Sequence, residues 1–205
     1  MSPSPQTPTE KAPTPIAVLA SHRGSNFQAI LDAIANGQLN ATVVLTISNN
    51  SQSEALARAA RASIPVLHLS GKTHPEPGEL DQAMATALNE SGAELVVTAG
   101  YMKKLGPITL AKFAGKVVNI HPSLLPKYGG QGMYGMRIHE AVIAAGDQES
   151  GLTIHLVDDE YDTGPILKQQ RVPVLATDTA ETLAERIIAE EHKLLVAALQ
   201  ELVSA

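Results

Sequence analysis

Short apolar runs alternate with helical patterns over the first half of the chain. Each run is bounded by polar or turn-forming residues, which is typical of a strand buried on both faces. The predicted strands lie at 16–20, 41–48, 64–70, 93–100 and 115–121. Apolar residues at helical spacing lie between them and predict helices at 27–34, 53–63, 79–89 and 107–113. This alternation predicts a parallel sheet with helices on both faces.

The pattern changes after the fifth of these strands. A glycine-rich loop at 128–136 precedes a predicted helix at 137–145. Two more strands, at 152–157 and 165–174, are separated by a gap too short for a helical crossover, so we expect them to run antiparallel. A long amphipathic helix at 179–203 follows. The predicted fold class is therefore α/β, a mostly parallel twisted sheet with antiparallel C-terminal strands.

The domain organisation follows from the same pattern. Residues 1–14 are rich in Pro, Thr and Ser and carry no apolar stretch, which predicts a disordered N-terminal tail. We expect a single domain over 15–205, since no internal repeat or second pattern of elements is present.

Composition narrows the function classes. The net charge of -6 offers no basic patch, so we expect no nucleic-acid partner. No apolar run approaches the roughly 20 residues of a membrane span, so we expect no membrane partner. The chain has no cysteine, which excludes disulfides, thiol catalysis and Cys-ligated metal. The absence of cysteine is also compatible with a reducing, cytoplasmic location.

The first candidate site is the turn after the first strand. Gly24 follows the strand, and Ser25 with Gln28 three places later fits a capping box. A helix that starts here presents free N–H groups at the carboxyl edge of the sheet, a ready phosphate site. The alternative is a simple helix cap. A Rossmann dinucleotide site fits less well, because the G-x-G-x-x-G pattern is absent.

The second candidate site is the end of the strand "VVNIH". Asn119 and His121 are two residues apart, so they share one side of the strand, and Pro122 ends the ladder. Two convergent donors suit a developing oxyanion, although a polar pair that satisfies the next loop is the alternative. Asp162, in the loop after a later strand, is the natural third member, since a carboxylate beside His121 favours the imidazolium.

A metal site is the competing interpretation of the acidic loop. Four carboxylates are clustered there: Asp158, Asp159, Glu160 and Asp162. Their spacing fits no EF-hand loop, which has a Gly at the sharp turn and a Glu at the end. We therefore expect no metal.

Three segments, "GSNFQAI", "NIHPSLLPKY" and "DEYDTGPI", together resemble the folate-dependent formyltransferases. The resemblance covers nearly the whole predicted domain and implies a Rossmann-like formyltransferase fold. Within the family, the "GSN" turn is similar to that of the enzymes of purine synthesis that formylate glycinamide ribonucleotide. The resemblance implies 10-formyltetrahydrofolate as co-substrate, no metal, and a tetrahedral oxyanion stabilised by Asn119 and protonated His121, with Asp162 holding the charge and helping proton transfer.

The same resemblance implies binding residues. Gly24, Ser25 and Asn26 would bind the substrate phosphate. Glu191 would lie near the substrate ribose, although a partly exposed surface Glu is an equal alternative. The residues implied for the folate pocket are Tyr101, Met102, Lys103, Leu105, Val157 and Asp159, and for these ordinary core packing is the alternative.

Some positions depart from the family pattern. His22 stands where relatives often have a glycine, Arg23 follows it, and Lys104 replaces an apolar residue. The loop 128–136 is longer than in many relatives and is either a lid or a surface variation. We expect His155, similar to a family histidine, to play a supporting role at most.

Two other functions stay open. A 10-formyltetrahydrofolate hydrolase shares the Asn, His and Asp but lacks the "GSN" signature. A non-catalytic phosphate-binding module would need none of the three. We expect a monomer or a homodimer.

Overall fold

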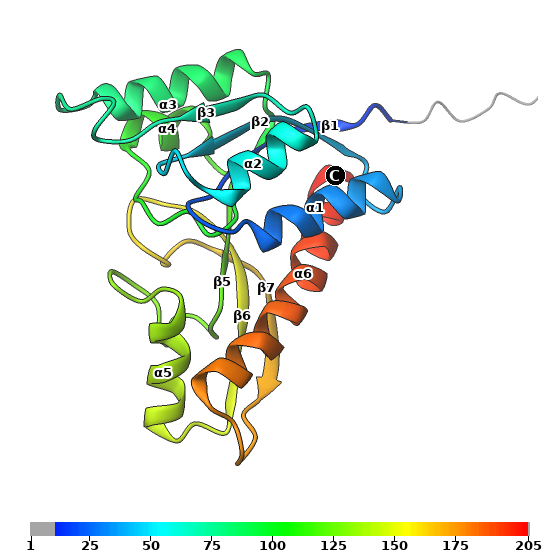
Figure 1. Ribbon diagram of the computed structural model, residues 1–205, viewed down its shortest axis with the longest axis vertical. Helices are drawn as coiled ribbons and strands as arrows, with labels where there is room; N and C mark the ends of the chain where they lie inside the picture. Colours follow the sequence, from blue (N-terminus) through cyan, green and yellow to red (C-terminus); the bar gives the residue numbers. More distant parts are fainter. Residues whose placement is uncertain (1–10, 205) are drawn as a thin grey trace, which may run out of the picture.

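A seven-stranded mixed sheet forms the centre of the protein, in the order β3-β2-β1-β4-β5-β6-β7 (Figure 1). The computed structural model describes residues 11–204. Its strands are β1 (Thr14–Leu19), β2 (Ala41–Ser48), β3 (Val66–His68), β4 (Leu95–Thr98), β5 (Val117–His121), β6 (Glu149–Leu156) and β7 (Ile166–Pro173). Its helices are α1 (Ser25–Ala35), α2 (Glu54–Arg61), α3 (Glu79–Glu90), α4 (Pro107–Lys112), α5 (Met136–Ala145) and α6 (Ala180–Ser204).

The predicted fold class is confirmed. Strands β1 to β5 pair in parallel, and β6 and β7 pair antiparallel. The pairing of β6 with β5 is also antiparallel, which the sequence pattern did not predict. Strand β2 has the predicted bounds, whereas β3 is shorter than the predicted run.

Both faces of the sheet are covered, which explains the continuous apolar runs. In β1, Ile16 and Val18 pack on one face with α1, α2, α5 and α6. Ala17 and Leu19 point to the other face, where they meet residues of α3 and the end of α4. In Figure 1, α3 and α4 lie together on one side, and α1 and α6 lie on the other. A strand between two helical layers cannot alternate polar and apolar residues, because both of its sides are buried.

The residues just before the predicted domain, which starts at 15, have partners in the structure. Residues 1–10 of the tail lie outside the described residues. Lys11, however, accepts a hydrogen bond from Asn40 Nδ2 at its carbonyl (2.8 Å) and donates from Nζ to the carbonyl of Val203 (2.9 Å). Thr14 is already part of β1. The ordered contacts of this part of the chain therefore extend at least to Lys11.

Candidate active site

The candidate site lies where the carboxyl ends of three parallel strands meet. β1, β4 and β5 are neighbours in the sheet, so the segments that follow them emerge at one edge. The strand order also reverses here, since the chain leaves β1 toward β2 and later returns to β4 on the other side. Ligands of open α/β sheets bind at such a switch point.

The turn after β1 differs from its prediction in one respect. Gly24, with φ 68°, is the N-cap of α1, and no side chain caps the helix, so the predicted capping box of Ser25 and Gln28 is wrong. Gln28 instead donates to Asp32 and accepts from Arg58. A Cβ at position 24 would lie 2.9 Å from that of Ala55, so both the backbone angle and the close approach of α2 favour glycine.

Asn119 is held by its neighbours on both sides. It pairs with Thr98 of β4 and with His155 of β6. Thr98 Oγ1 donates to Asn119 Oδ1 at 2.6 Å, and Asn119 Nδ2 lies 3.0 Å from His155 Nε2. The sequence analysis missed Thr98. It is a polar residue that ends an apolar run, but its pairing with Asn119 is visible only once the strand register is known.

His121 lies beside Asp162 at the end of β5. It is 5% exposed, its Nε2 lies 2.8 Å from the carbonyl oxygen of Tyr128, and its Nδ1 lies 3.4 Å from Asp162 Oδ1. A carbonyl only accepts, so Nε2 carries a proton. The chain after Pro122 thus bends back to contact the histidine through the backbone of Tyr128.

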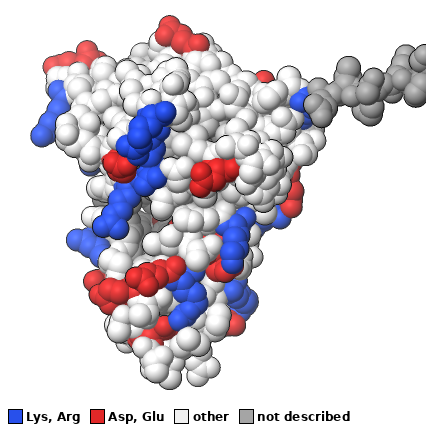
Figure 2. Space-filling view, turned by 45° about the vertical axis from the view of Figure 1, so that its right-hand side comes forward, with Lys and Arg blue, Asp and Glu red and all other residues white. Residues whose placement is uncertain are grey.

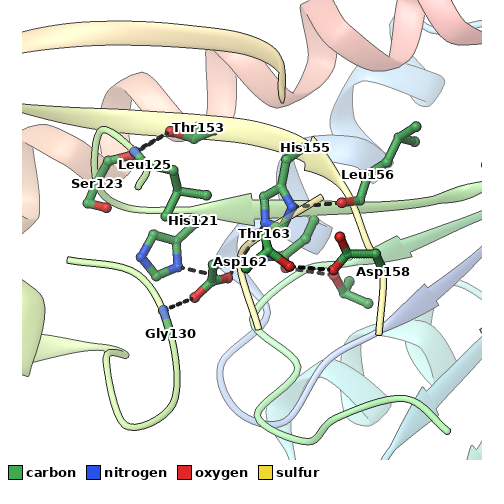
Figure 3. A network of polar contacts seen from close by, with 12 residues as sticks. His121, Ser123, Leu125, Gly130, Thr153, His155, Leu156, Asp158, Asp162 and Thr163 are labelled. Carbon is green, nitrogen blue, oxygen red and sulfur yellow. Dashed lines mark hydrogen bonds and ion pairs between the residues drawn. The ribbon is translucent and has the colours of Figure 1, made fainter. Parts of the chain in front are cut away.

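Asp162 is positioned by a loop that brings it back toward the sheet. Its backbone has φ 59°, and its Oδ2 accepts from the N–H of Gly130 at 2.8 Å (Figure 3). Its Oδ1 lies 3.6 Å from His155 Nε2. Burial works to raise the pKa of this carboxyl, but the contacts from His155, His121 and Gly130 outweigh it and hold the pKa below its usual range. Asp162 is therefore ionised near neutral pH.

Burial works against the expected charge of His121. Burial lowers the pKa of the imidazole. The carboxylate of Asp162 and the carbonyl of Tyr128 raise it, but they only partly offset the cost of placing a charge in a dry site. The lowered pKa favours the neutral imidazole when no substrate is bound.

Glu191 is buried, so the interpretation as a surface residue is wrong. The residue is 7% exposed, on the face of α6 that packs against α1. Asn26 Nδ2 donates to Glu191 Oε2 at 3.2 Å. Burial raises the pKa of the carboxyl to about 7, with the Asn26 hydrogen bond opposing the shift. Asn26 Oδ1 is buried and has no hydrogen-bond partner within residues 11–204.

The two segments predicted to form the folate pocket approach each other. Lys104 Nζ lies 3.3 Å from Glu160 Oε2, which joins the loop after β4 to the loop after β6. Leu105 is buried, and the partly buried Tyr101 and Val157 pack against the same core cluster. Burial raises the pKa of Tyr101 to about 12.

The other folate candidates lie at the surface of these loops. Met102 is half-buried, and its N–H donates to Ser21 Oγ at 2.8 Å. Packing in the hydrophobic core explains the position of Leu105. Lys103 and Asp159 are exposed, so core packing does not explain these two residues.

The acidic loop has internal partners for some of its carboxylates. Asp158 accepts from the Thr163 hydroxyl (2.8 Å) and from the N–H of Glu160 (3.2 Å). Within residues 11–204, no group of three or more His, Cys, Asp or Glu side chains is placed to hold a metal ion. On the face shown in Figure 2, acidic and basic side chains are interspersed. None of the helices in the described part of the chain combines the length and apolar character needed to cross a membrane.

A family model described as formyl transferase matches residues 14–199, which include every candidate residue above. The chain belongs to the formyl transferase family. This formyl transferase chain is 40% identical over 179 residues to the phosphoribosylglycinamide formyltransferase of Haemophilus influenzae, covering 87% of this chain and 82% of that protein.

Two further proteins similar to this formyl transferase chain are also named phosphoribosylglycinamide formyltransferase. It is 44% identical over 188 residues to the chloroplastic phosphoribosylglycinamide formyltransferase of Vigna unguiculata, covering 91% of this chain but only 60% of that protein's length. The crystal structure of phosphoribosylglycinamide formyltransferase from Bacillus halodurans is similar with a TM-score of 0.87 and 38% identity, covering 93% of this chain and 96% of that one.

Proposed function

We propose that this protein transfers the formyl group of 10-formyltetrahydrofolate to the primary amine of glycinamide ribonucleotide, a step of purine biosynthesis. The observation that carries the proposal is the convergence of Asn119, His121 and Asp162 at the switch point of the sheet. The named relatives are phosphoribosylglycinamide formyltransferases, which supports this substrate pair.

Substrate binding in this proposal uses the start of α1. The backbone N–H groups of Gly24, Ser25 and Asn26, with the positive end of the helix dipole, hold the phosphate. Glu191 accepts from the ribose hydroxyls. The folate lies between the loops after β4 and β6, and the residues proposed to contact it are Tyr101, Met102, Lys103, Leu105, Val157 and Asp159.

The chemistry proceeds through a tetrahedral intermediate. The amine nitrogen forms a bond to the formyl carbon, and the carbonyl oxygen becomes an oxyanion. Asn119 donates its free Nδ2–H to that oxygen. The bond from the formyl carbon to the folate nitrogen then breaks, and the proton lost by the amine goes to the leaving nitrogen.

His121 and Asp162 move that proton. The negative charge that develops on the oxyanion raises the pKa of the neighbouring imidazole, so His121 takes up a proton at Nδ1 as the intermediate forms. Asp162, 3.4 Å away, is the counter-ion of the imidazolium. A histidine that is neutral at rest and charged in the transition state stabilises the transition state selectively.

The test is a formyl-transfer assay with both substrates. Asp162→Asn should lower kcat by about 100-fold or more, since it removes an acid–base group, while binding of the ribonucleotide is retained. Glu149→Gln is the matched control, because it removes an exposed carboxylate that pairs with Arg171 outside the proposed site, and it should stay within about 2-fold of the unmodified protein. Unchanged transfer by Asp162→Asn would contradict the mechanism.

An assay arm without the amine substrate addresses the hydrolase. Deformylation that does not depend on glycinamide ribonucleotide would favour a 10-formyltetrahydrofolate hydrolase. The structure of a formyltetrahydrofolate deformylase from Pseudomonas syringae is similar with a TM-score of 0.83, but at 23% identity this likeness concerns the fold alone. The proposal needs no metal and includes the cytoplasmic location inferred from the cysteine-free composition.

A further inference from the structure

One hydrogen-bonded row crosses three strands at the candidate oxyanion donor. Thr98, Asn119 and His155 occupy the same rung of β4, β5 and β6. Their side chains are joined in order, from Thr98 Oγ1 to Asn119 Oδ1 (2.6 Å) and from Asn119 Nδ2 to His155 Nε2 (3.0 Å). Thr98 is 5% exposed and His155 2%, so bulk water does not compete for these bonds.

The protons of this row determine which way the amide faces. His155 Nδ1 lies 2.8 Å from the carbonyl oxygen of Leu156, which can only accept, so Nδ1 carries the proton (Figure 3). In a neutral ring Nε2 is then an acceptor, and it takes one N–H of Asn119. A flipped amide would set Asn119 Oδ1 against this acceptor, which leaves both atoms unsatisfied.

Thr98 acts at the other end of the amide. Its single hydroxyl proton has two acceptors within reach, Asn119 Oδ1 at 2.6 Å and the Val118 carbonyl at 3.2 Å, and the shorter contact is to the amide. A hydrogen bond to the amide oxygen polarises the group and strengthens its N–H donors. One N–H of Asn119 is used by His155, and the second has no partner among residues 11–204.

We propose that Thr98 is a positioning residue for formyl transfer, whose hydroxyl orients and polarises the Asn119 amide so that its free N–H meets the oxyanion. This inference rests on the proposed function. It concerns a side chain that does not touch the substrate and acts only through Asn119.

Thr98→Val tests the inference, because valine keeps the shape and removes the hydroxyl. Loss of a whole oxyanion donor costs about 100- to 1000-fold in kcat, and loss of its orientation should cost less, about 5- to 50-fold. The KM values for both substrates should stay within about 2-fold, since the oxyanion exists only after attack. Thr98→Ser restores the hydroxyl and should recover kcat to within about 3-fold of the unmodified protein.

Thr46→Val is the matched control. Thr46 is a fully buried residue of β2, and its hydroxyl has no hydrogen-bond partner in the described part of the chain. The same substitution there should leave kcat unchanged. If Thr98→Val does not fold, the pair Thr98→Ser and Thr98→Ala decides, since serine should keep kcat and alanine should lose it.

The outcomes separate the inference from the proposed function. An active parent protein with an equally active Thr98→Val variant overturns the role of Thr98 alone. Equal kcat values for Thr98→Ser and Thr98→Ala do the same. A parent protein without formyl transfer overturns the proposed function and the inference together.

Discussion

Glu191 is a carboxylic acid among the apolar residues of α6, and its protonation links folding to pH. Its pKa is raised by burial to about 7, against 4.5 for an unperturbed Glu. The folded protein therefore holds this proton more tightly than the unfolded chain does. The stability associated with the proton is fully present below pH 4.5 and is lost as pH rises through 7.

Replacement of Glu191 by Gln should remove this loss. At pH 8 we expect Glu191→Gln to be more stable than the parent protein by on the order of 2 kcal/mol, with the difference vanishing near pH 4.5. Urea unfolding at several pH values measures it. The control is Glu190→Gln, which alters the neighbouring carboxyl that pairs with Lys193 at the surface. If the difference in free energy of unfolding between the Glu191 variant and the parent were the same at all pH values, Glu191 would not be a buried group that titrates in this range.

At the level of elements, α2 supports the turn that precedes α1. Arg58 Nε donates to the carbonyl of Arg23 at 2.9 Å, and Arg58 Nη1 donates to Gln28 Oε1 at 2.7 Å. The N–H of Ala55 donates to the carbonyl of His22 at 3.1 Å. Two of these contacts hold the backbone of the proposed phosphate turn, and the third holds the Gln28 side chain in the first turn of α1.

Arg58→Ala should loosen this turn without affecting the reacting groups. Since hydrogen bonds to charged groups contribute about 1.5–3 kcal/mol, we expect the KM for glycinamide ribonucleotide to rise about 10-fold or more with kcat within about 2-fold. Steady-state kinetics at saturating formyl donor measure both. Arg61→Ala on the same helix is the control, because the one ion pair of Arg61 within the described residues is with exposed Glu54. A change confined to kcat would show that the helix acts on the chemistry instead.

The helices and strands could be predicted where the spacing of apolar residues along the chain determines them. The strand 41–48 has its predicted bounds, and its last four residues, 45–48, are all buried. The capping box failed because Gly24, at φ 68°, already ends the turn and Arg58 recruits Gln28. Asn119, His121 and Asp162 could be grouped from strand alternation and motif. Thr98 and Arg58 could not, since their partners depend on strand register and on the packing of α2.

At the scale of the whole molecule, buried and partly buried histidines contribute to the response to acid. Burial lowers the pKa of His121, His139 and His192. The unfolded chain therefore binds protons that the folded protein excludes. The stability that these three histidines contribute is present above their unperturbed pKa of about 6.5 and is lost as pH falls below it.

His139→Gln should weaken this acid sensitivity. His139 is 4% exposed, and its Nδ1 has no hydrogen-bond partner within the described residues. Between pH 7 and pH 5, the variant should lose less free energy of unfolding than the parent, by about 1 kcal/mol. Urea unfolding at the two pH values gives the difference. His22→Gln, at an exposed position, should behave as the parent does, and an equal loss in both variants would contradict the prediction.

The contact between Asn26 and Glu191 joins residues 165 positions apart. Closing so long a loop is entropically costly, and the chain leaves the ribosome from its N-terminus. The parallel strands and the turn before α1 can therefore form while α6 is still being synthesised. The proposed ribose contact arises only when α6 docks against α1, so it forms after the turn that supplies Asn26.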